Sequence, residues 1–130
     1  MQLIKVMQCI KWPAKIIVRN TSKSYRNDIG ERWFYWKIFI ETEPPSLINQ
    51  IQAVEYHLHP TFRVKDILIT NKNTGFRLEA QGWGEFIIKM DVILNDNRST
   101  TLSHYLSLDD SAIKEKKETV KIVSEKDLIY

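Results

Sequence analysis

The most constraining feature of this sequence is a run of alternating apolar and polar residues past its middle. From residue 86 to residue 94 every even position is apolar, while charged side chains stand at Glu85, Lys89 and Asp91. A period of two is that of a β-strand, whose successive side chains point to opposite faces of a sheet. The run therefore predicts a strand whose buried face is formed by Phe86, Ile88, Met90, Val92 and Leu94.

Shorter runs with the same period lie on both sides of this strand. Residues 34–40 have apolar side chains at even positions, and Pro44 and Pro45 end that run because proline cannot donate to a strand ladder. Polar residues 95–99 predict a turn into a returning strand that has His104 on its leucine-rich face. Further strands are predicted at residues 14–20, 53–60 and 66–80, the last as one or two strands with a turn at 73–75.

Six to eight short strands separated by turn signals, with no convincing helix, are typical of an antiparallel sandwich or barrel. The C-terminal segment differs, because residues 109–130 are dense in charges of both signs. We expect a sandwich domain over residues 1–108, followed by a charged tail over 109–130 that forms a short helix or one edge strand through residues 119–123.

Composition limits the classes of protein to which this chain can belong. With 130 residues, 43% of them hydrophobic, we expect one globular domain. Cys9 is the only cysteine, so no internal disulfide forms and a reducing compartment fits. The first twelve residues lack the pattern of a signal peptide, and no stretch is long and apolar enough to span a bilayer. We therefore expect a cytoplasmic protein, a monomer with no cofactor and no membrane segment.

Two short segments carry unusual chemistry. The sequence GWGEF at residues 82–86 places Trp83 between two of the four glycines of the chain. Because Trp83 has the odd parity, it faces away from the core if strand pairing extends that far, and the glycines leave the backbone open to close approach. The sequence HLHPTF at residues 57–62 ends a strand with a proline-broken turn. A turn lying beside GWGEF would place Phe62 opposite Trp83, as a slot for a flat neutral group; the alternative is a bulge whose tryptophan packs under a loop.

These residues resemble the YEATS domain, an immunoglobulin-like antiparallel β-sandwich of about seven to eight strands. VEYHLHPTF, followed about twenty residues later by GFRLEAQGWGEFIIKMDVIL, matches the two family motifs in order, and WKIFIE resembles an upstream strand. The resemblance covers residues 14–108 and is closest to the prokaryotic branch. It implies a reader module, not an enzyme, that binds an acylated lysine on a partner protein or peptide, with acetyl, crotonyl or similar planar acyl groups held in an aromatic cage.

The resemblance also implies roles for individual residues. Phe62 and Trp83 match the two aromatics that enclose the acyl group, Thr61 matches the hydroxyl that bonds its amide, and His59 matches the histidine that lines the pocket. The backbone N–H of Trp83 matches the donor to the acyl carbonyl, and Gly82 and Gly84 shape the approach. A further aromatic that guards the slot in relatives has three alternatives here, Arg32, Trp33 and Tyr35. The acidic residue that grips a neighbouring arginine in several eukaryotic readers has no counterpart before Asp109, so histone tails are not the expected target.

Three other functions are alternatives to acyl-lysine recognition. His57 and His59 share one strand face, as metal ligands do, with His104 as a third ligand, but we interpret His104 as a hydrogen-bonded core histidine and expect no metal site. Nucleic-acid binding would use the net charge of +3, yet basic and acidic residues are interleaved rather than clustered. A protein-interaction module of a prokaryotic signalling system, binding through a sheet edge or another ligand, remains the main alternative.

Overall fold

The computed structural model describes residues 13–108 and 118–123 of the chain. Cys9, the N-terminal segment and most of the expected charged tail lie outside these residues. Within them the chain forms eight strands and two short 3-10 helices. In chain order these are β1 (Ala14–Arg26), β2 (Arg32–Glu43), η1 (Pro45–Gln50), β3 (Ile51–His57), β4 (Asp66–Ile69), η2 (Lys72–Thr74), β5 (Leu78–Gly82), β6 (Ile87–Leu94), β7 (Ser99–Tyr105) and β8 (Thr119–Val123).

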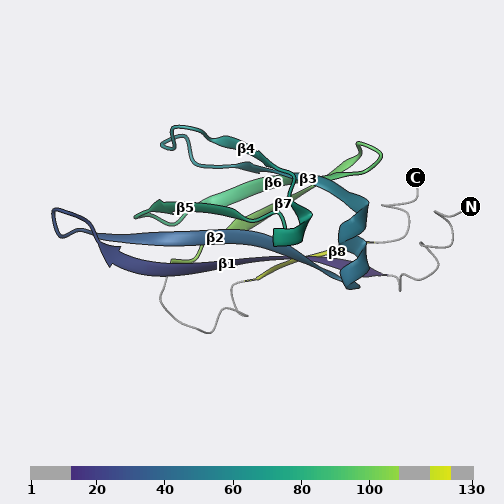
Figure 1. Ribbon diagram of the computed structural model, residues 1–130, viewed down its shortest axis with the longest axis horizontal. Helices are drawn as coiled ribbons and strands as arrows, with labels where there is room; N and C mark the ends of the chain where they lie inside the picture. Colours follow the sequence, from purple (N-terminus) through teal and green to yellow (C-terminus); the bar gives the residue numbers. More distant parts are fainter. Residues whose placement is uncertain (1–12, 109–117, 124–130) are drawn as a thin grey trace, which may run out of the picture.

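The strands form two stacked sheets of four strands each, so the protein is an all-β sandwich (Figure 1). One sheet has the order β5-β2-β1-β8 and the other β4-β3-β6-β7, and all pairs are antiparallel. The expected edge strand in the C-terminal segment is β8, which pairs with the beginning of β1. Neither 3-10 helix is long and apolar enough to cross a membrane.

The core lies between the sheets and follows the alternation seen in the sequence. Ile88, Met90 and Val92 of β6 are completely buried, as predicted for the even face. The largest fully buried side chains are Trp36, Tyr56 and Phe76, which come from β2, β3 and the segment before β5. Strands β1 to β7 each contribute apolar side chains to a common core, as period-two patterns require of a sandwich, whereas Val120 and Ile122 of β8 are exposed.

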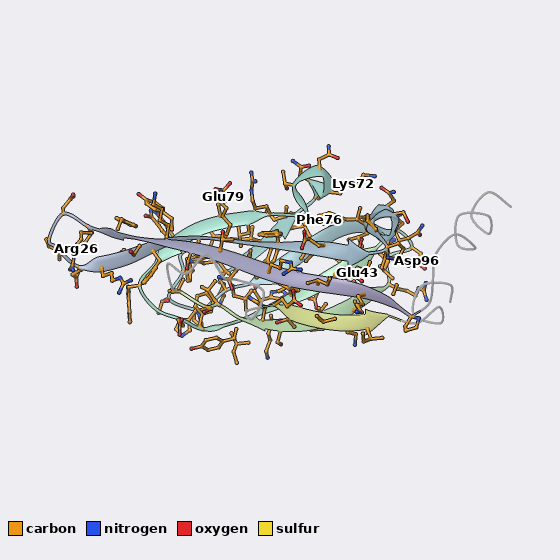
Figure 2. The ribbon with its side chains drawn as sticks, turned by 90° about the horizontal axis from the view of Figure 1, so that it is seen from below. Arg26, Glu43, Lys72, Phe76, Glu79 and Asp96 are labelled. Carbon is orange, nitrogen blue, oxygen red and sulfur yellow. The ribbon has the colours of Figure 1, made fainter. Side chains whose placement is uncertain are left out.

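The loop between β4 and β5 shows how close packing constrains the backbone. Gly75 has a φ of 71°, and a Cβ at this position would lie 2.6 Å from the carbonyl oxygen of Ile40. The next residue, Phe76, also has a positive φ of 55°, and its carbonyl accepts a hydrogen bond of 2.6 Å from the buried hydroxyl of Tyr56. Only glycine combines this backbone conformation with this clearance, so Gly75 is required for the loop to pack. Phe76 and Lys72 are labelled in Figure 2.

The long axis of the sandwich separates two sets of loops. Arg26, at the end of the β1–β2 hairpin, and Asp96, in the β6–β7 turn, lie at opposite ends of the molecule in Figure 2. The GWGEF segment lies at the hairpin end, because Gly82 pairs with Phe34 near the beginning of β2. The alternation suggested that this segment begins the strand that became β6, and that prediction is wrong. The segment connects β5 in one sheet with β6 in the other, and β6 begins only at Ile87.

Candidate ligand-binding site

A surface cleft of about 440 Å³ opens at the hairpin end of the sandwich. The loop between β3 and β4 forms one side, and the crossover from β5 to β6 forms the other. The six residues that the sequence singled out all line this cleft: His59, Thr61, Phe62, Gly82, Trp83 and Gly84. Five further residues line it as well: Trp33, Arg63, Gln81, Glu85 and Phe86. Two motifs about twenty residues apart in the chain therefore meet at one site.

The β3–β4 loop is held in shape by hydrogen bonds at its base and within it. The N–H of Leu58 donates to the carbonyl of Lys65 at 2.6 Å, and the N–H of Phe62 donates to the carbonyl of His59 at 2.9 Å. The backbone N–H and the hydroxyl of Thr61 lie 3.2 and 2.9 Å from Nδ1 of His59. Because a backbone N–H can only donate, Nδ1 carries no proton and accepts from both groups. The oxygen of the Thr61 hydroxyl is then left able to accept a hydrogen bond from a ligand.

Aromatic rings form the floor of the cleft. Phe62 lies 5.5 Å from Phe86 and 6.2 Å from Trp36, measured between ring centroids. His59 contacts Phe86 edge-on at 5.9 Å. The contacts of Phe62 with Trp36 and of His59 with Phe86 are edge-to-face, the contact of Phe62 with Phe86 is tilted by 49°, and together they restrict the orientation of these rings. Phe62 therefore presents a preorganised apolar surface to the cleft.

Trp83 forms a second aromatic side of the cleft and is largely free of the protein. Its side chain is 73% exposed, which is a large apolar area to leave in water. Its ring makes no ring contact with Phe62 in the described part of the chain, so the two aromatics border the cleft without closing it. Trp83 is exposed because it lies on the crossover between sheets, rather than because strand parity turns it outward.

The two glycines beside Trp83 are not needed for the fold. Neither has the positive φ found at Gly30 and Gly75. A Cβ at Gly84 would meet nothing within 4 Å, and a Cβ at Gly82 would meet the Cζ of Phe62 at 3.9 Å and Nε1 of Trp36 at 4.0 Å, which are ordinary contacts. Backbone conformation and packing therefore both tolerate alanine at these two positions, and the absence of a Cβ leaves space beside the cleft open.

The structure separates the three alternatives for the additional slot residue. Trp33 lines the cleft, and Tyr35 does not. Tyr35 instead stacks on Tyr25, with ring centroids 4.2 Å apart. Arg32 lies over the ring of Phe34 and lines a neighbouring hollow that is bordered by Trp33 and Trp83. Of the three alternatives, Trp33 is therefore the one that lines the cleft.

Glu85 is a site residue that the sequence reasoning had assigned only to the outer face of a strand. Its two carboxylate oxygens accept hydrogen bonds from the hydroxyl of Tyr105 at 2.8 Å and from the N–H of Leu108 at 2.7 Å. Glu85 therefore fastens the crossover to the end of β7, with both of its oxygens already bonded. The other missed residues, Arg63, Gln81 and Phe86, are direct neighbours of the motif residues in the sequence, and that adjacency was the available signal.

The three histidines do not converge on one point. His104 is buried between the sheets, with Nε2 2.7 Å from the side-chain oxygen of Asn20 and Nδ1 2.7 Å from the hydroxyl of Thr119. Burial lowers the pKa of His104 to about 4, so the imidazole is neutral at pH 7. The prediction of a hydrogen-bonded core histidine is therefore confirmed. The three-histidine metal site weighed as an alternative is not formed.

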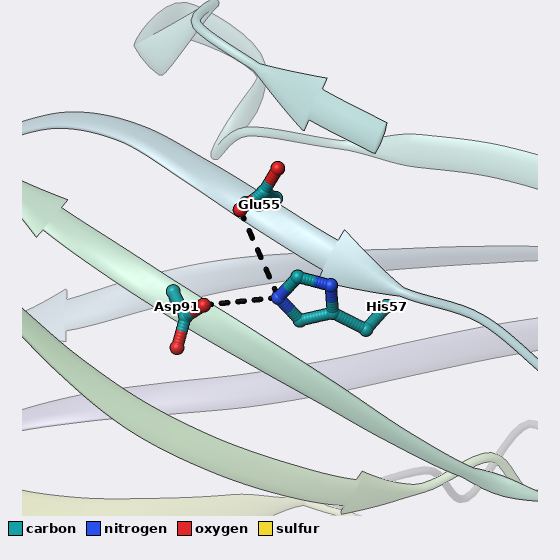
Figure 3. Close-up of side chains that lie close together, drawn as sticks. All are labelled: Glu55, His57 and Asp91. Carbon is teal, nitrogen blue, oxygen red and sulfur yellow. Dashed lines mark hydrogen bonds and ion pairs between the residues drawn. The ribbon is translucent and has the colours of Figure 1, made fainter. Parts of the chain in front are cut away.

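His57 lies on the outer face of β3 among acidic side chains. Nδ1 is 2.8 Å from a carboxylate oxygen of Asp66. Nε2 is 2.9 Å from a carboxylate oxygen of Asp91 and 3.8 Å from one of Glu55 (Figure 3). Glu55, His57 and Asp91 are the one group of three residues of metal-ligating type, in the part of the chain that the structure describes, whose ligand-type atoms lie within 4.8 Å of one another. Both imidazole nitrogens already face carboxylates within hydrogen-bond distance, however, which is the geometry of an ion pair.

Comparison with known families identifies this architecture. A family model described as the prokaryotic YEATS domain matches residues 34–107, which is more than half of the chain. The protein belongs to this family. The match begins in β2 and ends just after β7, so it includes both segments that border the cleft of this YEATS domain.

Solved structures of other YEATS domains have the same fold. The yeast AF-9 homolog protein Yaf9 is 22% identical, with a TM-score of 0.67 over 88% of this chain and 82% of that chain. The Yaf9 YEATS domain bound to H3K27ac is 24% identical, with a TM-score of 0.61 over 90% of this chain and 92% of that chain. The Yaf9 YEATS domain recognizing an H3K122suc peptide is 23% identical, with a TM-score of 0.61 over 91% and 92% of the two chains. At these identities the likeness establishes the sandwich fold.

Proposed function

We propose that this YEATS domain is a non-enzymatic reader that binds an acylated lysine of a partner protein in the cleft between Phe62 and Trp83. The observation that carries the proposal is the convergence of the two motif segments on one open, aromatic cleft whose flanking glycines the fold does not require. Membership of the YEATS family supports a reader role, and the Yaf9 structures supply examples with acylated histone peptides.

The chemistry of the cleft favours a neutral, planar guest. The acyl amide would lie between the rings of Phe62 and Trp83, donating its N–H to the Thr61 hydroxyl and accepting from the backbone N–H of Trp83. His59 supports this arrangement because its Nδ1 accepts the hydrogen bond of the Thr61 hydroxyl, which leaves the oxygen of that hydroxyl free to accept one from the ligand. A flat acyl group gains stacking contacts with both aromatic sides of the cleft.

An unmodified lysine is disfavoured by the same surroundings. Its ammonium group would lose hydration on entering the cleft, where the one carboxylate that the described residues contribute to the lining, that of Glu85, is engaged by Tyr105 and Leu108. Cation–π attraction to the rings offsets only about 0.5–2 kcal/mol of that loss. The cleft therefore discriminates by charge, and the slot contact itself depends little on salt.

The experiment is a calorimetric titration with three peptides of one sequence that carry unmodified, acetylated or crotonylated lysine. We expect binding of the acylated peptides only, lost in Trp83→Ala and Phe62→Ala. Ile122→Ala is the matched control, because this exposed apolar residue lies on β8, which pairs with the far end of β1. Equal affinity for the three peptides, or binding that survives both cleft substitutions, rejects the proposal; the second result would favour a partner bound at a sheet edge.

A further inference from the structure

The cluster on the outer face of β3 has a direct connection to the cleft. His57 is the last residue of β3, immediately before the loop that carries His59, Thr61 and Phe62. Its register partner on β4 is Asp66, the first residue after the same loop, and its register partner on β6 is Lys89. One imidazole thus stands at the point where both ends of the loop leave the sheet.

The hydrogen bonds of His57 determine its charge. An ionised carboxylate can only accept hydrogen bonds, and each imidazole nitrogen faces one, Asp66 at 2.8 Å and Asp91 at 2.9 Å. Both bonds form at once only when both nitrogens carry a proton, which makes the ring a cation. Asp91 is held in place from its other side, because its second oxygen accepts a hydrogen bond of 2.8 Å from Thr101 on β7.

We infer that His57 is a positioning residue for the acyl-lysine cleft: its imidazolium clamps β4 to β3 and β6 at the base of the loop, and ligand binding weakens when the ring loses its proton. This inference rests on the function proposed above. The residue does not line the cleft and acts only through the loop that begins beside it.

Loss of the proton must break one of the two bonds. A neutral imidazole would turn a lone pair toward a carboxylate less than 3 Å away, and the two groups would separate. The weaker side is β4, because it is a four-residue strand at the edge of its sheet, paired only with β3. Asp91 lies in the eight-residue strand β6, between two neighbouring strands. Deprotonation therefore releases the Asp66 end of the loop first.

The charged groups around the ring of His57 move its deprotonation to a pH above that of an ordinary histidine. Asp66 from β4, Asp91 from β6 and Glu55 from β3 favour the cation, and Lys89 from β6 opposes it. Hydrogen bonds to Asp66 and then Asp91 raise the pKa of His57, and the bond from His57 lowers the pKa of Asp91. The pKa of His57 is higher in the folded protein than in the unfolded chain, where it is about 6.5. The clamp is therefore fully present below about pH 6.5 and is lost as the pH rises through the pKa of His57 in the folded protein.

The test is the affinity of the crotonylated peptide between pH 6 and pH 9, measured for the wild-type protein and three variants. In the wild-type protein we expect Kd to rise about threefold to tenfold across this range, since the ring is partly exposed to solvent. His57→Gln removes the cation and should bind weakly at every pH without that step. His57→Arg restores a permanent cation with several donors and should bind tightly throughout. Glu55→Gln is the matched control, because Glu55 lies at 3.8 Å without a hydrogen bond to the ring, and it should keep the step.

A wild-type pH profile in His57→Gln would overturn the inference, because the step would then belong to a group other than His57. Finding one metal ion per protein molecule that a chelator removes would also overturn the inference. Nε2 of His57 would then be a metal ligand and could not donate a hydrogen bond to Asp91. If the wild-type protein binds no acylated peptide at any pH, the proposed function fails. The clamp by His57 is then tested on the protein without ligand. In that test, the amide 1H–15N signals of residues 58–66 must shift with the protonation of His57 in the wild-type protein and in Glu55→Gln, and must stay fixed in His57→Gln. Signals that stay fixed in all three proteins refute the clamp.

Discussion

Replacing Gly82 by alanine should separate ligand binding from stability. Gly82 ends β5 and lies on the crossover side of the cleft, with its Cα directed so that a Cβ would meet Phe62 Cζ at 3.9 Å and Trp36 Nε1 at 4.0 Å. Both are ordinary van der Waals separations, and the φ of Gly82 is not in the positive region. The variant should therefore fold without strain, with a free energy of unfolding unchanged or raised by up to about 1 kcal/mol, because alanine loses less backbone entropy on folding.

Gly82→Ala should weaken ligand binding, although it should leave the stability unchanged or raise it. The added methyl group would occupy space against the Phe62 ring that the proposed acyl group uses. Adding a methylene-sized group to a well-packed site costs about 1–3 kcal/mol. We take the lower part of this range because the cleft is open, which corresponds to affinity for a crotonylated peptide that is about 5-fold to 30-fold weaker.

Gly75→Ala provides the contrasting case on the same sandwich. Its φ of 71° and the 2.6 Å approach of a Cβ to the Ile40 carbonyl require the backbone to move. We expect a loss of about 2–4 kcal/mol in the free energy of unfolding. Because this loop does not line the cleft, the affinity per folded molecule should stay at the wild-type value.

Urea unfolding followed by tryptophan fluorescence gives the stabilities, and calorimetry under folding conditions gives the affinities. Wild-type affinity in Gly82→Ala would show that the ligand does not approach Phe62 at this position, and the acyl-slot geometry would have to be abandoned. A destabilisation of Gly82→Ala by more than about 1 kcal/mol would show that glycine is needed here for folding after all.

Three further predictions concern the scaffold. Acidification from pH 7 to pH 4 should remove about 3 kcal/mol of stability through His104, whose pKa falls from 6.5 to about 4 on folding, so that the unfolded chain takes up the proton first. This loss should be seen in urea titrations of the wild-type protein and be absent from those of His104→Gln. Glu85→Ala should cost about 1–3 kcal/mol in the same assay by leaving the buried N–H of Leu108 unpaired, whereas a change below about 0.5 kcal/mol would deny that role. Tyr56→Phe should cost about 1–2 kcal/mol in thermal unfolding, since the carbonyl of Phe76 loses its buried donor, and an unchanged melting temperature would contradict this.

Strand positions and buried faces were predictable because they depend on local information. The alternation of residues 86–94 and of residues 34–40 fixed which side chains point inward, and the buried faces of β6 and β2 agree with it. His104 was assigned to the core for the same reason, since it shares parity with three buried leucines. Period two is a property of one strand and needs no knowledge of its neighbours.

Residue types in the two motifs also indicate the candidate site from the sequence alone. A tryptophan between glycines and a proline-broken turn with threonine and phenylalanine are unusual enough to be noticed in one sequence. Their chemistry, two aromatics with a hydroxyl and an imidazole, is readable from the letters alone. Their proximity was a hypothesis, because nothing local places residues 59–62 beside residues 82–84.

Only the tertiary structure decided how the strands are shared between the two sheets. Since β5 pairs with β2 while β6 pairs with β3, the GWGEF segment crosses from sheet to sheet and exposes Trp83. Trp33 and Tyr35 of β2 have the same parity, yet only Trp33 lines the cleft, while Tyr35 stacks on Tyr25. Strand pairing also gathers Asp66, Asp91 and His57 from three strands. Alternation sets the face of a side chain, but the identity of its neighbours depends on long-range strand pairing, which is determined by the packing of the whole core.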